Sequence, residues 1–379
     1  MSNAISYLAQ LVGMPTLTVE VAANELALDF LEQFFAERGM HCQRWQFEGC
    51  GALSASTRKD NHKTATVCLS AHNDIVSGSK ELFTMREQGG KLYGRGVFDM
   101  KFATAGYMQL VDELHQEGTL RDYDFNILIT TDEELTKGYG KSGVSGLLRS
   151  GFRPRVAILP DSTAPGWAIE KVAKGWWRFD LIAKGISVHS ARPWEGDSAS
   201  MKLVEALHEL KEHFKDHGPL TDSLNFGAIN GEGVYNQVPD SISAKVEIRL
   251  ASDQSWPKNK AFVDGLCQRH DLAYNTFSLV EPMKPILDDP LVDTYRDVVE
   301  RVVGKRPEGH ISLGGSDAPY FTEAGIPCIV SCPLGGKHHS EDEWLDKESF
   351  LQFVPILRAY LAEVADTPAV SVDKRTAKV

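Results

Sequence analysis

The chain has 379 residues, of which 42% are hydrophobic, 24% charged and 9% aromatic. This length suggests two domains at roughly 150 residues per domain, and the hydrophobic content excludes intrinsic disorder as the main state. The 52 acidic residues outnumber the 40 basic ones and give a formal net charge of -12. That balance argues against a nucleic-acid-binding protein, because such proteins need a clustered basic surface to neutralise phosphates.

The sequence shows no membrane or secretion signal. No apolar run approaches the ~20 residues that span a bilayer, and the N-terminus lacks the basic and apolar stretches of a signal peptide. The six cysteines are scattered and form no CxxC pair, so we interpret them as reduced thiols and not as a disulfide framework. We therefore expect a cytoplasmic protein that binds neither nucleic acid nor membrane.

The first third of the chain alternates helix and strand patterns. Residues 20–38 carry apolar side chains at helical spacing and predict a helix that ends at Gly39. The segments 66–70, 125–130 and 156–159 are rich in apolar and β-branched residues without polar alternation. Such runs are typical of strands buried on both faces of an α/β sheet.

The middle of the chain predicts a different arrangement. Strand patterns at 176–183, 223–229, 241–250 and 272–280 alternate with helix patterns at 198–214 and 258–270. The resulting order, βαββαβ, is the ferredoxin-like split. This segment is followed by Pro282 and Pro285, which interrupt regular structure.

The remainder returns to helix and strand alternation. It predicts a helix at 291–303, short strands near Ile311 and at 329–331, and a helix at 347–364. The tail after Asp366 lacks apolar periodicity, so we expect it to fray. The simplest fold is an α/β domain with a mixed, mostly parallel sheet, formed by residues 1–173 and 285–379 and interrupted by a smaller α+β domain at 174–284.

Chemically versatile side chains follow the predicted buried strands, where ligands of open α/β sheets gather. His72 and Asp74 lie two residues apart at a strand end and project to the same side. The imidazole can bind a metal while the carboxylate accepts its other N–H, although a loop histidine and a turn aspartate would give the same pattern. Asp99 precedes a predicted helix, where it can bridge two cations or simply cap the helix.

Further acidic residues and a histidine follow later strands. Asp132, Glu133 and Glu134 come directly after the strand at 125–130, and three consecutive carboxylates would repel one another without a cation. The alternative is an acidic first helical turn. Asp161 follows the strand at 156–159, and His339 follows a Gly-Gly pair. Asp, Glu and His ligands without Cys suit a catalytic zinc pair with open positions.

One glycine motif suggests another chemistry. Residues 138–143 match G-x-G-x-x-G, but residues 131–137 separate them from the strand at 125–130, where a dinucleotide-binding loop should begin at once. Leu135 also stands where a phosphate-binding loop needs its first glycine. We predict a helix start here and keep a nucleotide-dependent enzyme as a minor alternative.

Two motifs, at 94–101 (GRGVFDMK) and 132–134 (DEE), resemble those of the di-zinc metallopeptidases of family twenty. The order and spacing of His72, Asp161 and His339 around these motifs resemble that family as well. That family includes acetylornithine deacetylase, succinyl-diaminopimelate desuccinylase, aminoacylase, carboxypeptidase G and di- and tripeptidases. The resemblance covers nearly the whole chain. It implies two zinc ions per chain, with cobalt or manganese as substitutes, and a homodimer formed through the inserted domain, which would act as a lid.

The resemblance also implies which residues hold the metals. His72 and Asp161 would bind one zinc, Glu134 and His339 the other, and Asp99 would bridge the two. Aspartate at position 161 is more typical of the di- and tripeptidases than of the deacetylases and desuccinylases, which usually carry glutamate there. The ligand set therefore implies the metal chemistry and leaves the substrate open.

The same resemblance implies the catalytic roles. Glu133 would be the general base, and Asp74 would orient His72. His189, in the inserted domain, would polarise the scissile carbonyl in the active site of a partner subunit. Without the resemblance, His189 would be interpreted as an ordinary strand-end histidine.

Four positions match substrate-binding residues of the family: Asn236, Arg249, and Gly314 and Ser316 of a Gly-Gly-Ser-Asp loop. Arg249 would clamp a substrate carboxylate, although it could equally pair with a surface carboxylate. The expected activity is hydrolysis of the amide bond of a small N-acyl amino acid with a free carboxylate. The alternatives are a di-/tripeptidase or carboxypeptidase of the same family, and a non-catalytic relative that binds metal or peptide.

Overall fold

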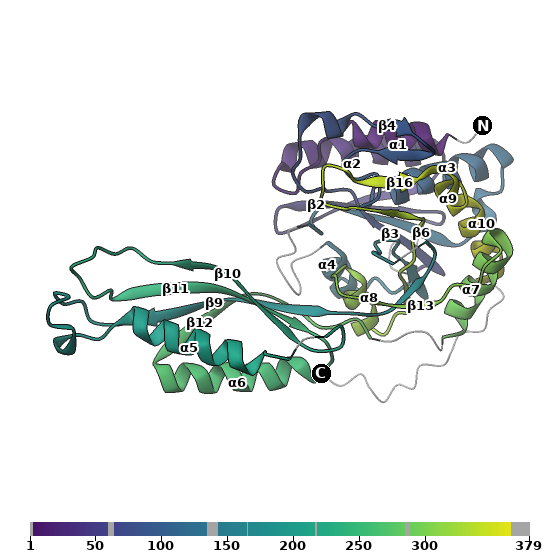
Figure 1. Ribbon diagram of the computed structural model, residues 1–379. Coiled ribbons are helices and arrows are strands. Elements are labelled where there is room, and N and C mark those ends of the chain that lie inside the picture. Colours follow the sequence, from purple (N-terminus) through teal and green to yellow (C-terminus); the bar gives the residue numbers. More distant parts are fainter. Residues whose placement is uncertain are drawn as a thin grey trace.

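The computed structural model describes residues 3–59, 64–134, 143–164, 166–216, 218–284 and 289–364. The expected frayed tail after Asp366 lies outside these residues, as does most of the glycine motif; only its last residue, Gly143, is described, as the first residue of α4. The described chain forms a rounded α/β unit and an elongated arm that extends from it (Figure 1).

A six-stranded sheet lies at the centre of the α/β unit. Its order is β1-β2-β6-β3-β7-β14, where β6, β3, β7 and β14 run parallel and the β1–β2 hairpin adds antiparallel pairs at one edge. Every residue of β3 and β6 is buried, as their continuous apolar patterns predicted. The strands are β1 (His41–Phe47), β2 (Cys50–Ser56), β3 (Val67–His72), β6 (Phe125–Thr130), β7 (Val156–Ile158) and β14 (Cys328–Ile329).

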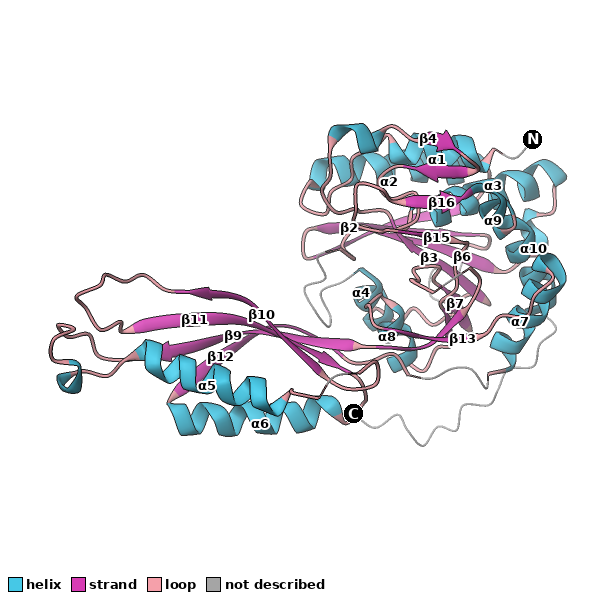
Figure 2. Ribbon diagram, viewed as in Figure 1, coloured by secondary structure: helices cyan, strands magenta, loops and turns pink. Residues whose placement is uncertain are grey.

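Helices cover this sheet on both faces (Figure 2). They are α1 (Ala4–Val12), α2 (Val21–Glu37), α3 (Lys101–Glu117), α4 (Gly143–Arg149), α7 (Pro290–Val303), α8 (Ala318–Glu323), α9 (Lys347–Leu351) and α10 (Phe353–Val364). The predicted α/β class with a mixed, mostly parallel sheet is confirmed. None of the described helices is both long enough and apolar enough to cross a membrane.

Short strands join the edges of the α/β unit. β15 (Gly335–Gly336), β16 (Trp344–Asp346), β5 (Lys91–Tyr93) and β4 (Arg86–Gln88) form a small antiparallel sheet in that order. β8 (Ile169–Ala173) pairs in parallel with β13 (Gly309–Ser312). Three short 3-10 helices, Lys80–Phe83, Leu120–Asp122 and Pro193–Glu195, complete the described elements.

The arm has the expected element order βαββαβ. An antiparallel sheet of order β10-β11-β9-β12 carries the two helices on one face (Figure 2). The elements are β9 (Gly175–Lys184), α5 (Ala199–His213), β10 (Ser223–Asn230), β11 (Ser241–Leu250), α6 (Ser255–His270) and β12 (Leu272–Val280).

The buried hydrophobic residues in the described part of the chain form two separate clusters. One lies in the α/β unit and contains residues from both ends of the chain, such as Leu8 and Ile356. The other lies within the arm, between its sheet and its helices, and includes Trp177 and Leu207. Each part therefore packs around its own core.

One predicted helix is wrong in its continuity. The segment expected as a single helix at 347–364 forms α9 and α10, which are separated at Gln352. Pro355 lies in the first turn of α10 and has no N–H to donate to the carbonyl of Leu351, so a continuous helix would lose that hydrogen bond.

Candidate metal centre and substrate cavity

The acidic and histidine residues converge because three parallel strands end side by side. In β3 and β6, His72 pairs with Thr130, so the segment after β6 begins beside His72. β7 pairs with β3 on its other side and leads to Asp161. The carboxyl ends of these strands therefore bring residues that are far apart in sequence to one edge of the sheet.

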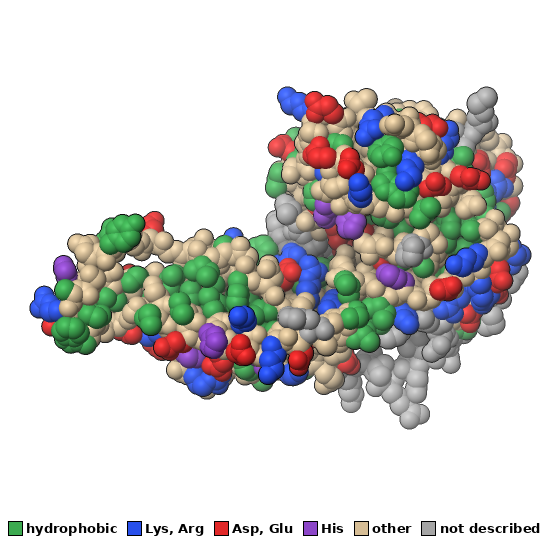
Figure 3. All heavy atoms as spheres, in the orientation of Figure 1, with side chains coloured by type: hydrophobic (Ala, Val, Ile, Leu, Met, Phe, Trp, Pro, Cys, Tyr) green, Lys and Arg blue, Asp and Glu red, His purple; other side chains and the backbone are tan. Residues whose placement is uncertain are grey.

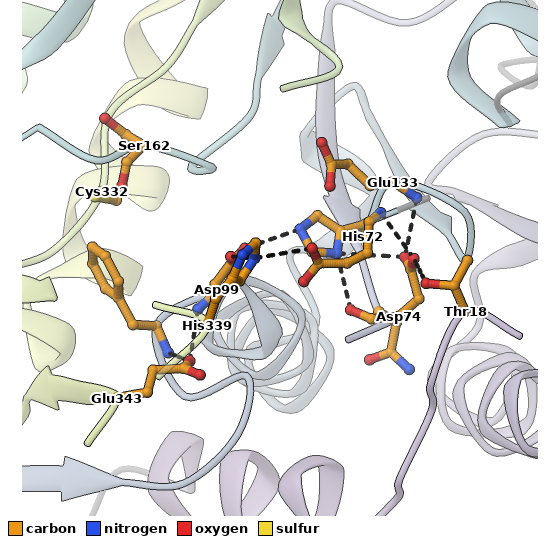
Figure 4. Close-up of polar contacts among 12 residues, drawn as sticks. Thr18, His72, Asp74, Asp99, Glu133, Ser162, Cys332, His339 and Glu343 are labelled. Atoms are coloured by element: carbon orange, nitrogen blue, oxygen red, sulfur yellow. Dashed lines mark hydrogen bonds and ion pairs between the residues drawn. The ribbon is translucent and has the colours of Figure 1, made fainter. Parts of the chain in front are cut away.

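His72 is held from two sides. Its Nε2 lies 3.2 Å from Asp99 Oδ1, and its Nδ1 lies 3.1 Å from the backbone oxygen and 3.4 Å from Oδ1 of Asp74 (Figure 4). Burial lowers the pKa of His72, but hydrogen bonds with Asp74 and Asp99 outweigh it and hold the pKa well above its usual value. An imidazole whose one nitrogen is fixed by protein acceptors presents the other as a ligand in a set orientation.

Asp74 organises the backbone around it. It is fully buried, and its carboxylate accepts hydrogen bonds from the backbone N–H groups of Glu133 and Glu134 at 3.3 and 3.1 Å. The hydroxyl of Thr18 donates to the same carboxylate at 2.7 Å (Figure 4). Asp74 therefore positions the Glu133–Glu134 segment as well as His72.

A second histidine completes the cluster. His339 Nε2 lies 3.0 Å from Asp99 Oδ2 and 3.0 Å from Glu134 Oε2. Asp99 thus contacts His72 through one oxygen and His339 through the other. His339 has a φ of 61°, in the left-handed region. This conformation costs a non-glycine residue about 1–3 kcal/mol.

A buried ion pair ties the segments that carry these groups together. Glu343 accepts the backbone N–H groups of Phe98 and Asp99 at 3.0 and 3.1 Å, and Arg95 donates to it at 2.8 Å. The same guanidinium donates to the backbone oxygens of Ser77 at 3.1 Å and Ser340 at 3.2 Å. We call this pair the Arg95–Glu343 clamp, because it links the segment that follows His72 with the loops on which Asp99 and His339 lie.

The donor atoms form two groups that fit divalent cations. His72, Glu133 and Asp161 make one group and Asp99, Glu134 and His339 the other, with the potential ligand atoms of each group within 4.8 Å of one another. Burial, followed by repulsion from Asp161, holds the pKa of Glu133 well above its usual range, and burial and repulsion from Asp99 do the same for Asp161. Cations between these carboxylates would offset both effects, so the residues present fit a divalent metal pair.

A cavity of about 260 Å³ opens over the cluster. It lies where the arm meets the α/β unit, and Figure 3 shows basic and histidine side chains at this junction. Beyond the cluster itself, the lining residues are Phe98, Ser162, Thr163, Trp176, Arg178, Arg249, Gly314, Gly315 and His338. The predicted substrate residues Arg249 and Gly314 therefore face the same space as Asp99 and Glu134.

Three predicted residues are not brought to this cavity within one chain. Ser316 is buried, and its hydroxyl accepts the N–H of Ala318 at the start of α8. His189 lies on the β9–α5 loop and Asn236 on the β10–β11 loop, and the two loops are in backbone contact. Figure 1 shows both loops at the far end of the arm, away from the α/β unit. At that distal position neither residue can act on the cluster of its own chain.

Sequence reasoning missed Trp176 and Arg178. Both line the cavity and lie two residues apart on β9, so they share one face of the sheet. The available signal was a cationic residue in a strand adjacent to the strand that carries Arg249. Its use would have required the pairing of β9 with β11, which the sequence alone did not provide.

Comparison with known proteins places this geometry in a family. Residues 68–363 match the model of peptidase family M20/M25/M40. The chain belongs to this family. As an M20 family member it is a hydrolase that acts on amide or peptide bonds and uses a divalent metal, as the sequence predicted.

Curated relatives of this M20 chain match it over most of its length. The succinyl-diaminopimelate desuccinylase of Delftia acidovorans is 24% identical, over 98% of this chain and 100% of the relative. A probable succinyl-diaminopimelate desuccinylase of Staphylococcus aureus is 26% identical, over 77% of this chain and 81% of the relative.

Solved structures share the fold of the M20 chain at lower identity. A tripeptidase from Staphylococcus aureus superimposes with a TM-score of 0.79 at 18% identity and covers 96% of this chain and 98% of its own. An M20 family metallo-carboxypeptidase from Sulfolobus solfataricus gives a TM-score of 0.77 at 14% identity, over 96% and 99% of the two chains. At these identities the likeness concerns the fold.

Proposed function

We propose that this protein hydrolyses the amide bond of a small N-acyl amino acid with a free carboxylate, using two zinc ions and Glu133 as general base. The observation that carries the proposal is the double cluster of His, Asp and Glu side chains, which shares one cavity with Arg249. The desuccinylase relatives, whose names denote removal of an acyl group from an amino acid, support the deacylase activity.

The proposed ligand assignment follows the two histidines. His72 and Asp161 would hold one zinc and Glu134 and His339 the other, with Asp99 between them, since its two oxygens face the two histidines. Divalent ions in such a site lower the pKa of water toward neutrality and polarise a carbonyl. Glu133 would accept a proton from the attacking water and later donate it to the leaving amine. An oxygen of Glu133 also lies within the His72–Asp161 group, so substitution must separate its role as base from a role as ligand.

The arm would act as a lid and dimerisation domain, spanning residues 174–284. Its hydrophobic cluster is separate from that of the α/β unit, which supports treating it as a domain. Large apolar side chains of its outer strands, such as Ile229 and Phe277, are exposed, and Figure 3 shows hydrophobic side chains gathered over this part of the arm. A surface of this kind is typical of an interface, and we propose a homodimer.

In the proposed dimer, the far end of each arm would reach the cavity of the other chain. The backbone N–H of Ala191 donates to Nδ1 of His189 at 3.1 Å. This contact leaves Nε2 as the protonated nitrogen of a neutral imidazole, ready to donate to the oxygen of the scissile carbonyl. Asn236, on the neighbouring loop, would bind the substrate beside it. The proposed cytoplasmic location rests on the sequence, in which the cysteines are scattered and form no CxxC pair.

Metal content and chelator reversal test the proposal first. We expect about two zinc per chain by elemental analysis of gently purified protein. Hydrolysis of a panel of N-acetyl amino acids and dipeptides should be lost to chelator and restored by zinc or cobalt. A protein without bound metal and without metal-dependent turnover would contradict the proposal.

Substitution of Glu133 separates base from ligand. Glu133→Ala should retain both metals and lose nearly all turnover, because no other group would take the proton from water. Turnover above about a tenth of the wild-type value would remove Glu133 from the mechanism. Loss of one metal in this variant would make Glu133 a ligand.

Complementation tests the contribution of the second chain. Glu133→Ala and His189→Ala should each be inactive alone, yet hybrid dimers contain one site with both residues intact. An equal mixture, after exchange of subunits, should regain about a quarter of the wild-type activity per chain. No recovery, despite exchange shown by tagged chains, would place His189 outside the partner's site.

A peptidase is the second candidate function. Asp161, which in the family is more typical of di- and tripeptidases, favours it. Preferential turnover of dipeptides over N-acetyl amino acids in the same panel would select this activity.

A further inference from the structure

A three-residue ionic group lies on the arm side of the cavity. Glu247 accepts the Nε–H of Arg178 at 2.5 Å through one oxygen and the Nε–H of Arg249 at 2.8 Å through the other. Glu247 lies directly opposite Arg178 across β11 and β9, and Arg249 lies opposite Trp176. The group is therefore built into the register of two paired strands and does not depend on a loop.

The two guanidiniums are fixed through their Nε atoms only. Among the described residues, the structure shows no other hydrogen bond or ion pair for the terminal Nη groups of Arg178 or Arg249. Both side chains line the cavity together with the metal cluster and keep 36% and 28% of their surface exposed. The donors not used by Glu247 are thus available to a molecule bound in the cavity.

The ring of Trp176 lies against both guanidiniums of this group. Its ring centre lies 5.3 Å from the guanidinium carbon of Arg178 and 5.8 Å from that of Arg249, distances at which a cation is attracted to an aromatic face. The ring is buried, and its indole N–H donates to Ser278 at 2.8 Å. A rigid aromatic side chain therefore holds both guanidiniums beside each other.

The charges of the group determine what it can bind. Burial raises the pKa of Glu247, but the hydrogen bond from Arg178 and the charge of Arg249 lower it below its usual value, so Glu247 is ionised. Two guanidiniums and one carboxylate leave a single positive charge. One further carboxylate would neutralise the group, whereas a second would add an uncompensated negative charge in a half-buried place.

We propose that Arg178 and Arg249 form a two-guanidinium receptor for one substrate carboxylate, with Glu247 holding both in position. The proposal rests on the proposed function, whose substrate carries a free carboxylate, and it adds Arg178 as a second residue that recognises that carboxylate. The two oxygens of a carboxylate offer about four acceptor sites, enough for donors from both guanidiniums at once. Arg178 is then a specificity-determining residue, because a terminal amide cannot replace the charge.

Binding measurements on a variant without turnover test the receptor. Isothermal titration on zinc-loaded Glu133→Gln would compare N-acetyl-leucine with N-acetyl-leucinamide, which differ only in the carboxylate. We expect the acid to bind roughly tenfold or more tightly than the amide. Adding Arg178→Gln should lower the affinity for the acid by about tenfold and the affinity for the amide by less than about twofold.

A double substitution separates direct contact from positioning. If Arg178 touches the carboxylate, Arg178→Gln should still lower the affinity for the acid several-fold in a protein that already carries Arg249→Gln. An effect of Arg178→Gln that disappears in that background would mean that Arg178 acts only through Arg249, and the two-guanidinium receptor would be refuted. Arg178→Lys should restore only part of the affinity, because lysine keeps the charge and loses the planar fork.

Arg269→Gln is the matched control. Arg269 also lies in the arm and pairs with a glutamate, Glu209, but it is not among the residues that line the cavity. Its substitution removes the same charge and should leave both affinities unchanged.

The outcomes also distinguish the receptor from the proposed hydrolase. Equal binding of acid and amide, or no detectable binding of either, would refute the receptor even if the wild-type enzyme turns over its panel. A wild-type protein without turnover whose binding still prefers the acid and depends on Arg178 would refute the hydrolase proposal and keep the receptor.

Discussion

The Arg95–Glu343 clamp makes a quantitative prediction about how the metal centre is assembled. Glu343→Ala removes the acceptor of two backbone N–H groups, those of Phe98 and Asp99, and the only carboxylate with which Arg95 forms an ion pair among the described residues. Glu343→Gln is the conservative change, because an amide oxygen can still accept both N–H groups. The two variants therefore separate the backbone contacts from the charge.

The burial of the pair sets the magnitude of the effect. The side chains of Arg95 and Glu343 are 2% and 0% exposed. Removal of one partner of such a pair costs roughly 3–5 kcal/mol, because the other charge remains buried without compensation. The two orphaned N–H groups would add about 1 kcal/mol each at the lower end of their range. For Glu343→Gln, which keeps an acceptor for both N–H groups but leaves the buried charge of Arg95 uncompensated, we expect about 3–5 kcal/mol.

Two measurements are needed, since a purely structural pair would change stability alone. Urea denaturation of chelator-treated protein gives the loss in the free energy of unfolding. Competition with a chelating dye gives the zinc affinity, which we expect to fall roughly 10–100-fold in Glu343→Gln because the backbone of Asp99 is less firmly held. Glu117→Gln is the control, since the Glu117–Arg358 pair is equally well formed, at 2.7 Å for both contacts, but lies in solvent.

The result that would refute this reasoning is an unchanged zinc affinity in a folded Glu343→Gln variant. The clamp would then stabilise the chain without positioning the ligands. Losses of equal size in Glu343→Gln and Glu117→Gln would likewise contradict the argument from burial.

Two further predictions concern the surroundings of the site. A Cβ on Gly315 would lie 2.2 Å from the ring of Trp176, whereas one on Gly314 meets nothing closer than 3.7 Å; Gly315→Ala should therefore cost about 1–3 kcal/mol and lower kcat/KM, while Gly314→Ala should leave the melting temperature unchanged. Burial raises the pKa of Glu170 from 4.5 to about 7, so the folded chain keeps a proton that the unfolded chain has released, and this group lowers stability as the pH rises through that interval. Glu170→Gln keeps the acceptor for the Ser162 hydroxyl, and its stability relative to wild type should rise by about 2–3 kcal/mol between about pH 5 and about pH 8 in chelator-treated protein. A constant difference across that range would contradict the pKa of Glu170.

The sequence predicted those parts of the site that depend on local pattern. The apolar runs that became β3 and β6 identified the sheet, and the rule that ligands follow strand ends then singled out His72, Asp161 and the Glu133–Glu134 pair. The element order βαββαβ of the arm followed from the alternation of patterns in the same way. These features are local, since each depends on a few consecutive residues.

Other features depend on which strands and loops meet, and the sequence did not contain that information in a local form. Arg95 and Glu343 are 248 positions apart, and neither residue stands out until the Asp99 loop and the His339 loop lie side by side. Arg178 became recognisable only when β9 paired with β11 in the register that sets it opposite Glu247. The break between α9 and α10 was missed because apolar spacing continues through Gln352, although Pro355 marks it.

The division of the metal centre between the two ends of the chain has a consequence for biosynthesis. His72, Asp99, Glu134 and Asp161 are synthesised before the arm, whereas His339 and β14 follow it. The nascent chain therefore carries a group of neighbouring carboxylates before His339 and Glu343, the partner of Arg95, have been synthesised. A chain that stops before Glu343 cannot close the clamp, so we expect it to lack hydrolytic activity.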